Sequence, residues 1–275
     1  MRLGSIHNFT WLSVELAMFF ASAAAADRPT EDPELLLRRI RSRTAAHLSQ
    51  LPNYACREMV DRTLRRGSTW NHLDTVQFEV ALVGRQELFS RPGEERFGDR
   101  SVGELAPGTI TDGVLGSQVD MIFASDATEF RYVGPAKKDG HQTFRYDLRV
   151  PQDKSGFVVS HNSAKATVEF EGSVWVDVET LDLVRADLKV KRIPSYVGVQ
   201  SVEKSMHYRL IHIADTDFLL PGKTELSATD DMGNYSLTVI RLDQCREFTG
   251  ESTIKYGAPT PDSTSRDRLD HPEHK

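Results

Sequence analysis

Residues 168–190 read VEFEGSVWVDVETLDLVRADLKV, and this stretch decides the fold. On either side of Glu179-Thr180, apolar residues occupy every second position and polar residues lie between them. An alternation of period two predicts strands with one apolar and one polar face, which is typical of an antiparallel sheet packed on one side. The Glu179-Thr180 pair predicts the turn between two such strands.

The alternation recurs elsewhere along the chain, for example in residues 75–82. Asp139-Gly140 predicts a hairpin between a strand at about 128–134 and one at about 142–150. Residues 230–234 predict another turn between strands. Short turns leave no room for the crossover helices of a parallel sheet, so the pattern predicts an antiparallel meander.

Two helices are expected beside these strands. Asp32 is a suitable N-cap, Pro33 suits the first helical position, and apolar residues then recur at helical spacing over about 33–50. A short second helix is predicted at about 114–124, after a loop at 103–116. The expected fold is therefore α+β and mostly antiparallel β, with one or two helices on one face of the sheet.

The chain divides into three predicted parts. An apolar block and a run of small residues give residues 1–26 the pattern of a signal peptide. The alternative is a buried or membrane-spanning helix, but the block is shorter than the roughly 20 apolar residues a span needs. Residues 30–256 are expected to form a single domain, and residues 257–275 a disordered tail. Export would place the protein in the periplasm or outside the cell.

Composition and motifs exclude several functions. The net charge of −6 speaks against a nucleic-acid partner. The chain lacks the nucleophile-elbow, zinc-protease and P-loop motifs. His207 and His212 differ in strand parity and are not expected to share a metal, and Glu169 and Glu171 are expected on a solvated face. We therefore expect no enzyme activity, no catalytic residue, no cofactor and no metal.

The remaining feature is the apolar face of the sheet. If the sheet curls into a half-barrel, two helices can leave a cavity on its concave side that suits an acyl chain. The alternative, which the sequence alone favours, is a filled core. The candidate lining residues are the aromatics Phe78, Phe130, Tyr132, Phe144, Tyr146, Phe170 and Tyr208.

Cys56 and Cys245 are the only cysteines. In an oxidising compartment they can form one disulfide bond, whereas in a reducing compartment they would be two buried thiols. The absence of a Cys-x-x-Cys motif argues against a redox-active pair.

Several motifs resemble those of bacterial lipoprotein-localisation carriers, the LolA/LolB-like superfamily. Residues 170–181 resemble a Trp-x-Asp strand end that leads into a Glu-Thr turn, and residues 217–221 resemble a later strand ending in Leu-Pro. Residues 51–56 and 245–252 are similar to the first and last motifs of a subgroup of secreted bacterial proteins.

The resemblance implies a curved half-barrel sheet of about 10–11 strands that holds acyl chains, and it supports a Cys56–Cys245 bridge. The expected function is thus an exported, non-enzymatic protein that binds an acyl chain or a lipidated envelope partner. It would be a monomer and at most peripheral to the membrane. The alternative is a structural or interaction protein of the envelope with a filled core.

Overall fold

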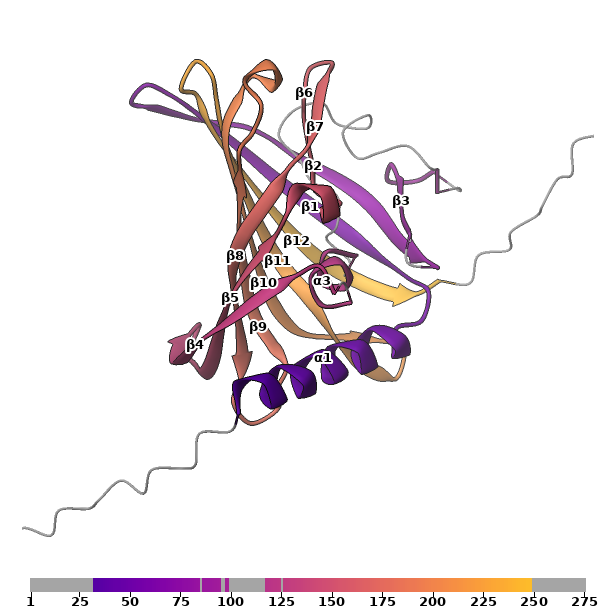
Figure 1. Ribbon diagram of the computed structural model, residues 1–275. Coiled ribbons are helices and arrows are strands. Elements are labelled where there is room, and N and C mark those ends of the chain that lie inside the picture. The colour runs from indigo at the N-terminus through magenta and orange to yellow at the C-terminus, as the bar shows by residue number, and fades with distance from the viewer. Residues whose placement is uncertain (1–31, 85, 95–96, 99–116, 125, 249–275) are drawn as a thin grey trace, which may run out of the picture.

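Ten strands form one antiparallel sheet that curves without closing (Figure 1). In spatial order they are β3 (Gln86–Ser90), β2 (Thr69–Val83), β1 (Tyr54–Arg66), β12 (Tyr235–Glu247), β11 (Thr216–Asp230), β10 (Val199–Ile213), β9 (Leu183–Lys191), β8 (Glu169–Asp177), β5 (His141–Val150) and β4 (Glu129–Lys138). Both helices, α1 (Pro33–Gln50) and α3 (Ser117–Phe123), lie on the concave side. The predicted α+β half-barrel is confirmed.

This computed structural model describes residues 32–84, 86–94, 97–98, 117–124 and 126–248. The predicted signal peptide at 1–26, the loop at 103–116 and the tail at 257–275 lie outside the described residues. Within the described part of the chain, no helix has both the length and the apolar run needed to cross a membrane.

The sheet is not a simple meander, because two of its pairings join distant parts of the chain. β5 pairs with β8, and β1 pairs with β12. The Cys56–Cys245 disulfide joins β1 to β12 across 189 residues of chain, as expected. Between β5 and β8 the chain forms a separate hairpin of β6 (Val158–His161) and β7 (Ala164–Thr167), which the sequence analysis did not predict. Short 3₁₀ turns, η1 (Gln152–Lys154) and η2 (Ser195–Val197), complete the described elements.

The period-two pattern sets which side chains face inward. Val60, Ile240, Thr224 and Met206 are direct neighbours across β1, β12, β11 and β10, so they share the inner face. All four are buried. Because opposed residues in an antiparallel pair share a face, the alternation within each strand builds one continuous inner wall.

The wall carries three apolar clusters. One surrounds the disulfide between β1, β2 and β12, and another lies under the β6–β7 hairpin. The third lies between the two helices and strands β5, β8, β9 and β10; we call it the helix-covered cluster. Among the described residues, α1 and α3 lie over this last cluster.

Candidate ligand-binding interior

Helix α1 covers the concave side through one narrow stripe. Leu36, Ile40 and Thr44 are its buried residues, spaced at three to four positions as an amphipathic helix requires. Asp32 accepts a hydrogen bond from the Glu34 amide at 2.9 Å and so caps the N-terminus of α1. Leu37 and Leu48 are partly buried and pack against the helix-covered cluster, and most other side chains of α1 are exposed. A small number of apolar side chains therefore holds the helix to the sheet.

Polar contacts fasten both ends of α1. At its start, the Tyr146 hydroxyl donates a hydrogen bond to the Pro33 carbonyl oxygen at 2.8 Å. Near its end, Asp182 accepts from Arg43 Nε at 2.8 Å and lies 2.7 Å from His47 Nε2. Burial opposes ionisation of Asp182, but the bonds from Arg43 and His47 outweigh it and lower the pKa of the carboxyl group. Asp182 lies in the turn between β8 and β9, so its contacts with Arg43 and His47 attach this turn to the helix; we call these contacts the clasp.

A small cavity remains beneath α1. Its volume is about 20 Å³, and it lies between the second half of α1, α3 and the ends of β9, β10 and β11. A water molecule needs about 10–15 Å³ measured in this way. This cavity therefore has room for about one water molecule. The lining residues include Leu48, Val119, Leu183, Tyr208 and Leu219.

Six of the seven aromatic candidates come together in the helix-covered cluster, and Phe78 does not. Phe78 packs in the cluster around the disulfide instead. Tyr146 and Phe170 are fully enclosed, whereas Phe130, Tyr132, Phe144 and Tyr208 pack at the margin of the helix-covered cluster. Only Tyr208 borders the cavity, and burial raises the pKa of its hydroxyl group. Whether the six aromatics contact a ligand stays a prediction.

The inner wall also carries buried polar groups that the sequence analysis missed. Lys204 is 1% exposed, and its Nζ lies 3.3 Å from Gln118 Oε1 on α3. Glu58 and Thr224 on other strands are equally enclosed. The signal was present in the sequence, because Lys204 is in phase with the buried Val202 and Met206 of β10. The inner wall is thus apolar under α1 but polar and charged in places beyond it.

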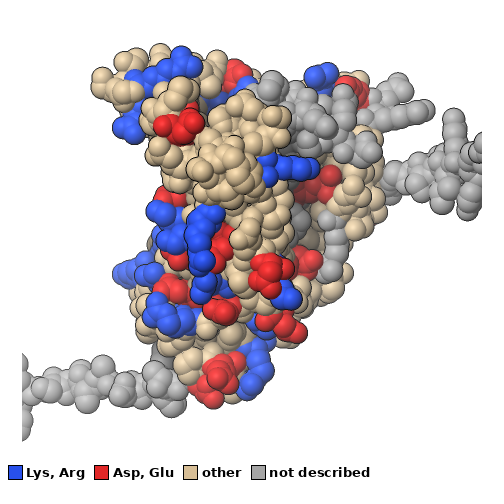
Figure 2. Space-filling model, turned by 45° about the horizontal axis from the view of Figure 1, so that its top comes forward, with Lys and Arg blue, Asp and Glu red and all other residues tan. Residues whose placement is uncertain are grey.

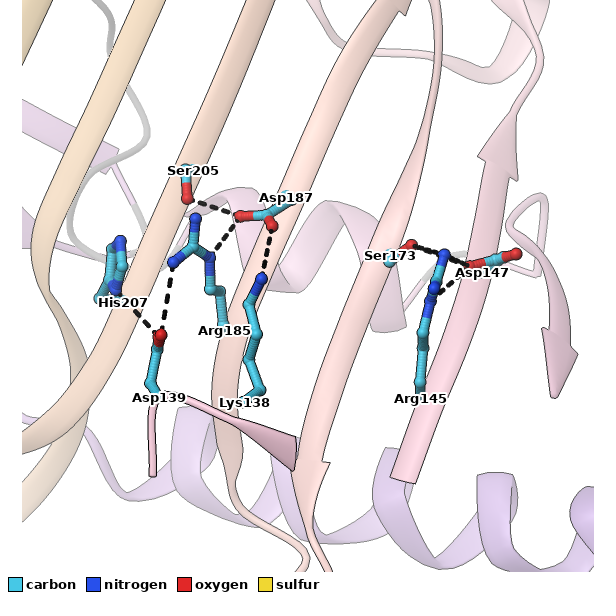
Figure 3. A network of polar contacts seen from close by, with 9 residues as sticks. All are labelled: Lys138, Asp139, Arg145, Asp147, Ser173, Arg185, Asp187, Ser205 and His207. Carbon is cyan, nitrogen blue, oxygen red and sulfur yellow. Dashed lines mark hydrogen bonds and ion pairs between the residues drawn. The ribbon is translucent and has the colours of Figure 1, made fainter. Parts of the chain in front are cut away.

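The convex face carries a network of charges and hydroxyl groups (Figure 3). Asp187 accepts from Ser205 Oγ at 2.5 Å, from Arg185 Nε at 2.6 Å and from Lys138 Nζ at 3.2 Å. Burial opposes ionisation, but these donors outweigh it and lower the pKa of Asp187. Because Ser205 donates to a carboxylate and not to a histidine, it is not placed as an activated nucleophile.

Neighbouring members of the network are also paired. Asp139 accepts a hydrogen bond from Arg185 Nη1 at 3.5 Å, and His207 Nδ1 lies 3.1 Å from it (Figure 3). Similar hydrogen bonds join Asp147 to Arg145 and Ser173. His212 contacts Asp217 instead, so the two histidines do not come together. Among the described residues, no cluster of three metal-ligating side chains occurs.

Glu169 departs from the expected solvated face. It is 8% exposed, because Arg149 Nη2 at 3.1 Å and Arg192 Nη2 at 3.0 Å lie over it. Burial opposes its ionisation, but these guanidinium groups outweigh it and lower its pKa. A groove of about 610 Å³ lies beside it on the same convex face and is lined mainly by charged side chains of β4, β5, β8 and β9.

Solved structures with a similar shape come from several bacteria. A DUF1329 family protein from Desulfovibrio piger is 14% identical, with 78% of this chain and 95% of that chain covered and a TM-score of 0.38. A putative outer membrane lipoprotein-sorting protein domain from Vibrio parahaemolyticus is 11% identical, with 80% and 95% covered and a TM-score of 0.44. The lipoprotein LppX from Mycobacterium tuberculosis is 13% identical, with 80% and 99% covered and a TM-score of 0.29.

One of these neighbours is a lipoprotein-sorting domain, the class of protein that the sequence motifs resemble. At such identities and TM-scores the likeness assigns no ligand or activity to this chain. No protein-family model matches the chain, and no curated protein matches it either.

Proposed function

We propose that the protein is an exported, non-enzymatic carrier that binds a hydrophobic ligand on the inner side of its half-barrel. The ligand is an acyl chain, either free or attached to a lipidated partner. One observation carries the proposal: in the part of the chain that the structure describes, the apolar wall of the helix-covered cluster is covered by two separate helices and not by a second sheet. A helix attached by one stripe can move aside without breaking any strand pairing.

The cavity of about 20 Å³ is too small for an acyl chain, so binding requires α1 to lift. Exposing the two fully buried aliphatic side chains of α1, Leu36 and Ile40, costs about 3–6 kcal/mol. Exposing the partly buried Leu37 and Leu48 and breaking the polar contacts at both ends of the helix add to this cost. Burying about 14 methylene groups contributes roughly 11 kcal/mol at about 0.8 kcal/mol each. The difference between these two free energies must also offset the loss of translational and rotational freedom when the ligand binds. We therefore expect reversible rather than very tight binding, as a carrier needs.

The proposed place of action is the bacterial periplasm or the exterior, with the protein as a monomer at most peripheral to the membrane. The sequence of residues 1–26 supports export, and the disulfide fits an oxidising compartment. Cell fractionation and N-terminal sequencing of the exported protein test this. A protein found only in the cytoplasm with residues 1–26 intact would contradict it.

Ligand binding is tested by lipid extraction with mass spectrometry and by titration with a fluorescent fatty acid. Two substitutions on α1 form a matched pair. Leu48 borders the cavity, whereas Leu35 on the same helix is 45% exposed. Leu48→Trp fills the space beneath the helix and is expected to weaken probe uptake, and Leu35→Trp is expected to leave it unchanged.

The carrier proposal fails if the purified protein is free of lipid and takes up no probe. It also fails if Leu48→Trp and Leu35→Trp bind the probe equally, because the ligand would then lie elsewhere. Circular dichroism of both variants checks that they are folded.

A second candidate is an interaction protein of the envelope with no ligand. The small size of the cavity beneath α1 favours it, and the charged groove on the convex face offers a surface for a protein partner. This candidate predicts no probe uptake in any variant. It also predicts an envelope protein crosslinked to the convex face, and Arg145→Glu in the groove should abolish that crosslink.

A further inference from the structure

Four hairpin tips meet at the end of the sheet farthest from α1 (Figure 1). They are residues 65–70, 161–165, 195–198 and 230–235, which we call the hairpin end. Hydrogen bonds join three of them: the Asp231 amide donates to the Gly198 carbonyl oxygen at 3.1 Å, and His161 Nδ1 lies 3.2 Å from the Val197 carbonyl oxygen. The 65–70 tip contacts the 230–235 tip through the Trp70 and Tyr235 rings, whose centroids are 5.8 Å apart. The tips therefore form one rigid surface and not four independent loops.

Large apolar side chains project from three of these tips. Trp70 is 53% exposed, Tyr196 is 68% exposed and Met232 is 79% exposed. Each comes from a different connection between strands, so they stand apart as separate points. An exposed tryptophan, tyrosine and methionine gathered at one end are unusual for a surface that faces only water.

Cations accompany these side chains. The Arg65 guanidinium lies between two rings, 5.6 Å from the centroid of Trp70 and 5.4 Å from that of Tyr235. Arg66 and Lys165 add two more cations to this end, from the 65–70 and 161–165 tips. Figure 2 turns this end toward the viewer and shows both basic and acidic side chains among uncharged surface there.

The acidic groups at this end have a structural use. Asp230 accepts from the Met232 amide at 3.0 Å and from the Asn234 amide and side chain at 2.8 Å each. These bonds hold the turn that projects Met232. The hairpin end contains three basic side chains and two acidic ones, Asp230 and Asp231. It therefore carries a small net positive charge, although the chain as a whole is acidic.

We propose that the hairpin end docks on the surface of an anionic lipid bilayer. Tryptophan and tyrosine favour the boundary between headgroups and acyl chains, and arginine and lysine bind lipid phosphates. Separate projecting tips fit a fluid surface, which closes around each of them. A protein partner would need a continuous complementary face of about 800 Å². Docking goes beyond the proposed carrier function and does not depend on it.

Flotation of the full chain with vesicles tests the proposal. One set of vesicles contains phosphatidylcholine only, and the other adds phosphatidylglycerol. We expect binding to the anionic vesicles, and a drop of about tenfold or more for the triple variant Trp70→Ser, Tyr196→Ser, Met232→Ser because its buried apolar area is lost. The control is Leu210→Ser, because Leu210 is 57% exposed near the far end of β10.

Double substitution of Arg66→Gln and Lys165→Gln is expected to reduce the preference for anionic vesicles while Trp70 still inserts. Quenching of Trp70 by brominated lipids reports that insertion, and Trp11→Phe with Trp175→Phe removes the competing signals of the other two tryptophans. Any of three results would overturn the proposal: no flotation of the wild type, equal flotation of the triple variant, or equal binding to both vesicle types. Sedimentation without vesicles tests for a fourth contradicting result, which is a dimer of the wild type that is lost in the triple variant. Such a dimer would assign the hairpin end to contact with a second copy of this chain.

Discussion

Asp182→Asn is expected to loosen helix α1 and speed ligand entry. The carboxylate accepts hydrogen bonds from Arg43 Nε at 2.8 Å and Nη2 at 3.4 Å, and His47 Nε2 lies 2.7 Å from Asp182 Oδ1. Asparagine keeps one acceptor oxygen but loses the charge and the second oxygen. Asp182 and His47 are each about one-fifth exposed, whereas Arg43 is 46% exposed and contributes less.

The size of the effect follows from these exposures. A hydrogen bond to a charged group contributes about 1.5–3 kcal/mol, and an exposed ion pair about 0–1 kcal/mol. Because one acceptor oxygen remains, we expect a loss of about 1.4–2 kcal/mol, which raises the population with α1 lifted about 10–30-fold. If α1 gates the interior, the association rate of a fluorescent fatty acid rises by the same factor.

Two measurements follow this change. Hydrogen exchange of the α1 amides reports how often the helix lifts, and stopped-flow fluorescence reports probe entry. The control is Asp243→Asn, because Asp243 makes a similar paired contact with Arg57 at 2.7 and 3.0 Å on strands away from α1. Unchanged exchange would refute the clasp assigned to Asp182. Faster exchange with unchanged entry would refute the role of α1 as the gate.

Three further predictions concern stability. Removing the disulfide with Cys56→Ala and Cys245→Ala should lower the free energy of unfolding by at most about 5 kcal/mol, since the bridge closes a loop of 189 residues. A loss below about 1 kcal/mol in urea denaturation would show that the disulfide does not stabilise the fold mainly through chain entropy. Gly172→Ala should destabilise the sheet by more than about 2 kcal/mol, because its Cβ would lie 2.1 Å from the Asp187 carbonyl oxygen, whereas Gly156→Ala meets only the flexible end of Met121; equal melting temperatures would contradict this. Asp182 and Asp187 have lowered pKa values, so their contribution to stability is complete above the ordinary value of about 3.9 and is lost as pH falls through the lowered values. In an acid titration, the free energy of unfolding of Asp187→Asn should therefore fall less steeply than that of the wild type. Superimposable curves would argue against the network.

Local pattern was sufficient for most of the architecture. The alternation around Glu179-Thr180 predicted β8 and β9, and the Asp139-Gly140 turn predicted the β4–β5 hairpin. Strand β4 extends to Lys138, beyond the expected end at 134, because edge pairing with β5 continues to the turn. The β6–β7 hairpin escaped notice because four-residue strands are too short to display a period.

The candidate site was less accessible from sequence. Period two predicts that Phe78 and Tyr146 face inward, and both do. It cannot say that they belong to different clusters, because that depends on which strands become neighbours. Nor does it explain how Glu169 is buried, since Arg149 and Arg192 reach it from other strands.

The sequence by itself determined the type and order of most elements, though not the β6–β7 hairpin, because strand alternation, helix caps and turn residues act over a few positions. Only the tertiary structure decided the pairing of β1 with β12, the clasp of Asp182 on α1, and the gathering of Trp70, Tyr196 and Met232 at one end. These features join residues far apart in the chain. Their free energy exists only once the curved sheet has brought them together, so no local pattern records them.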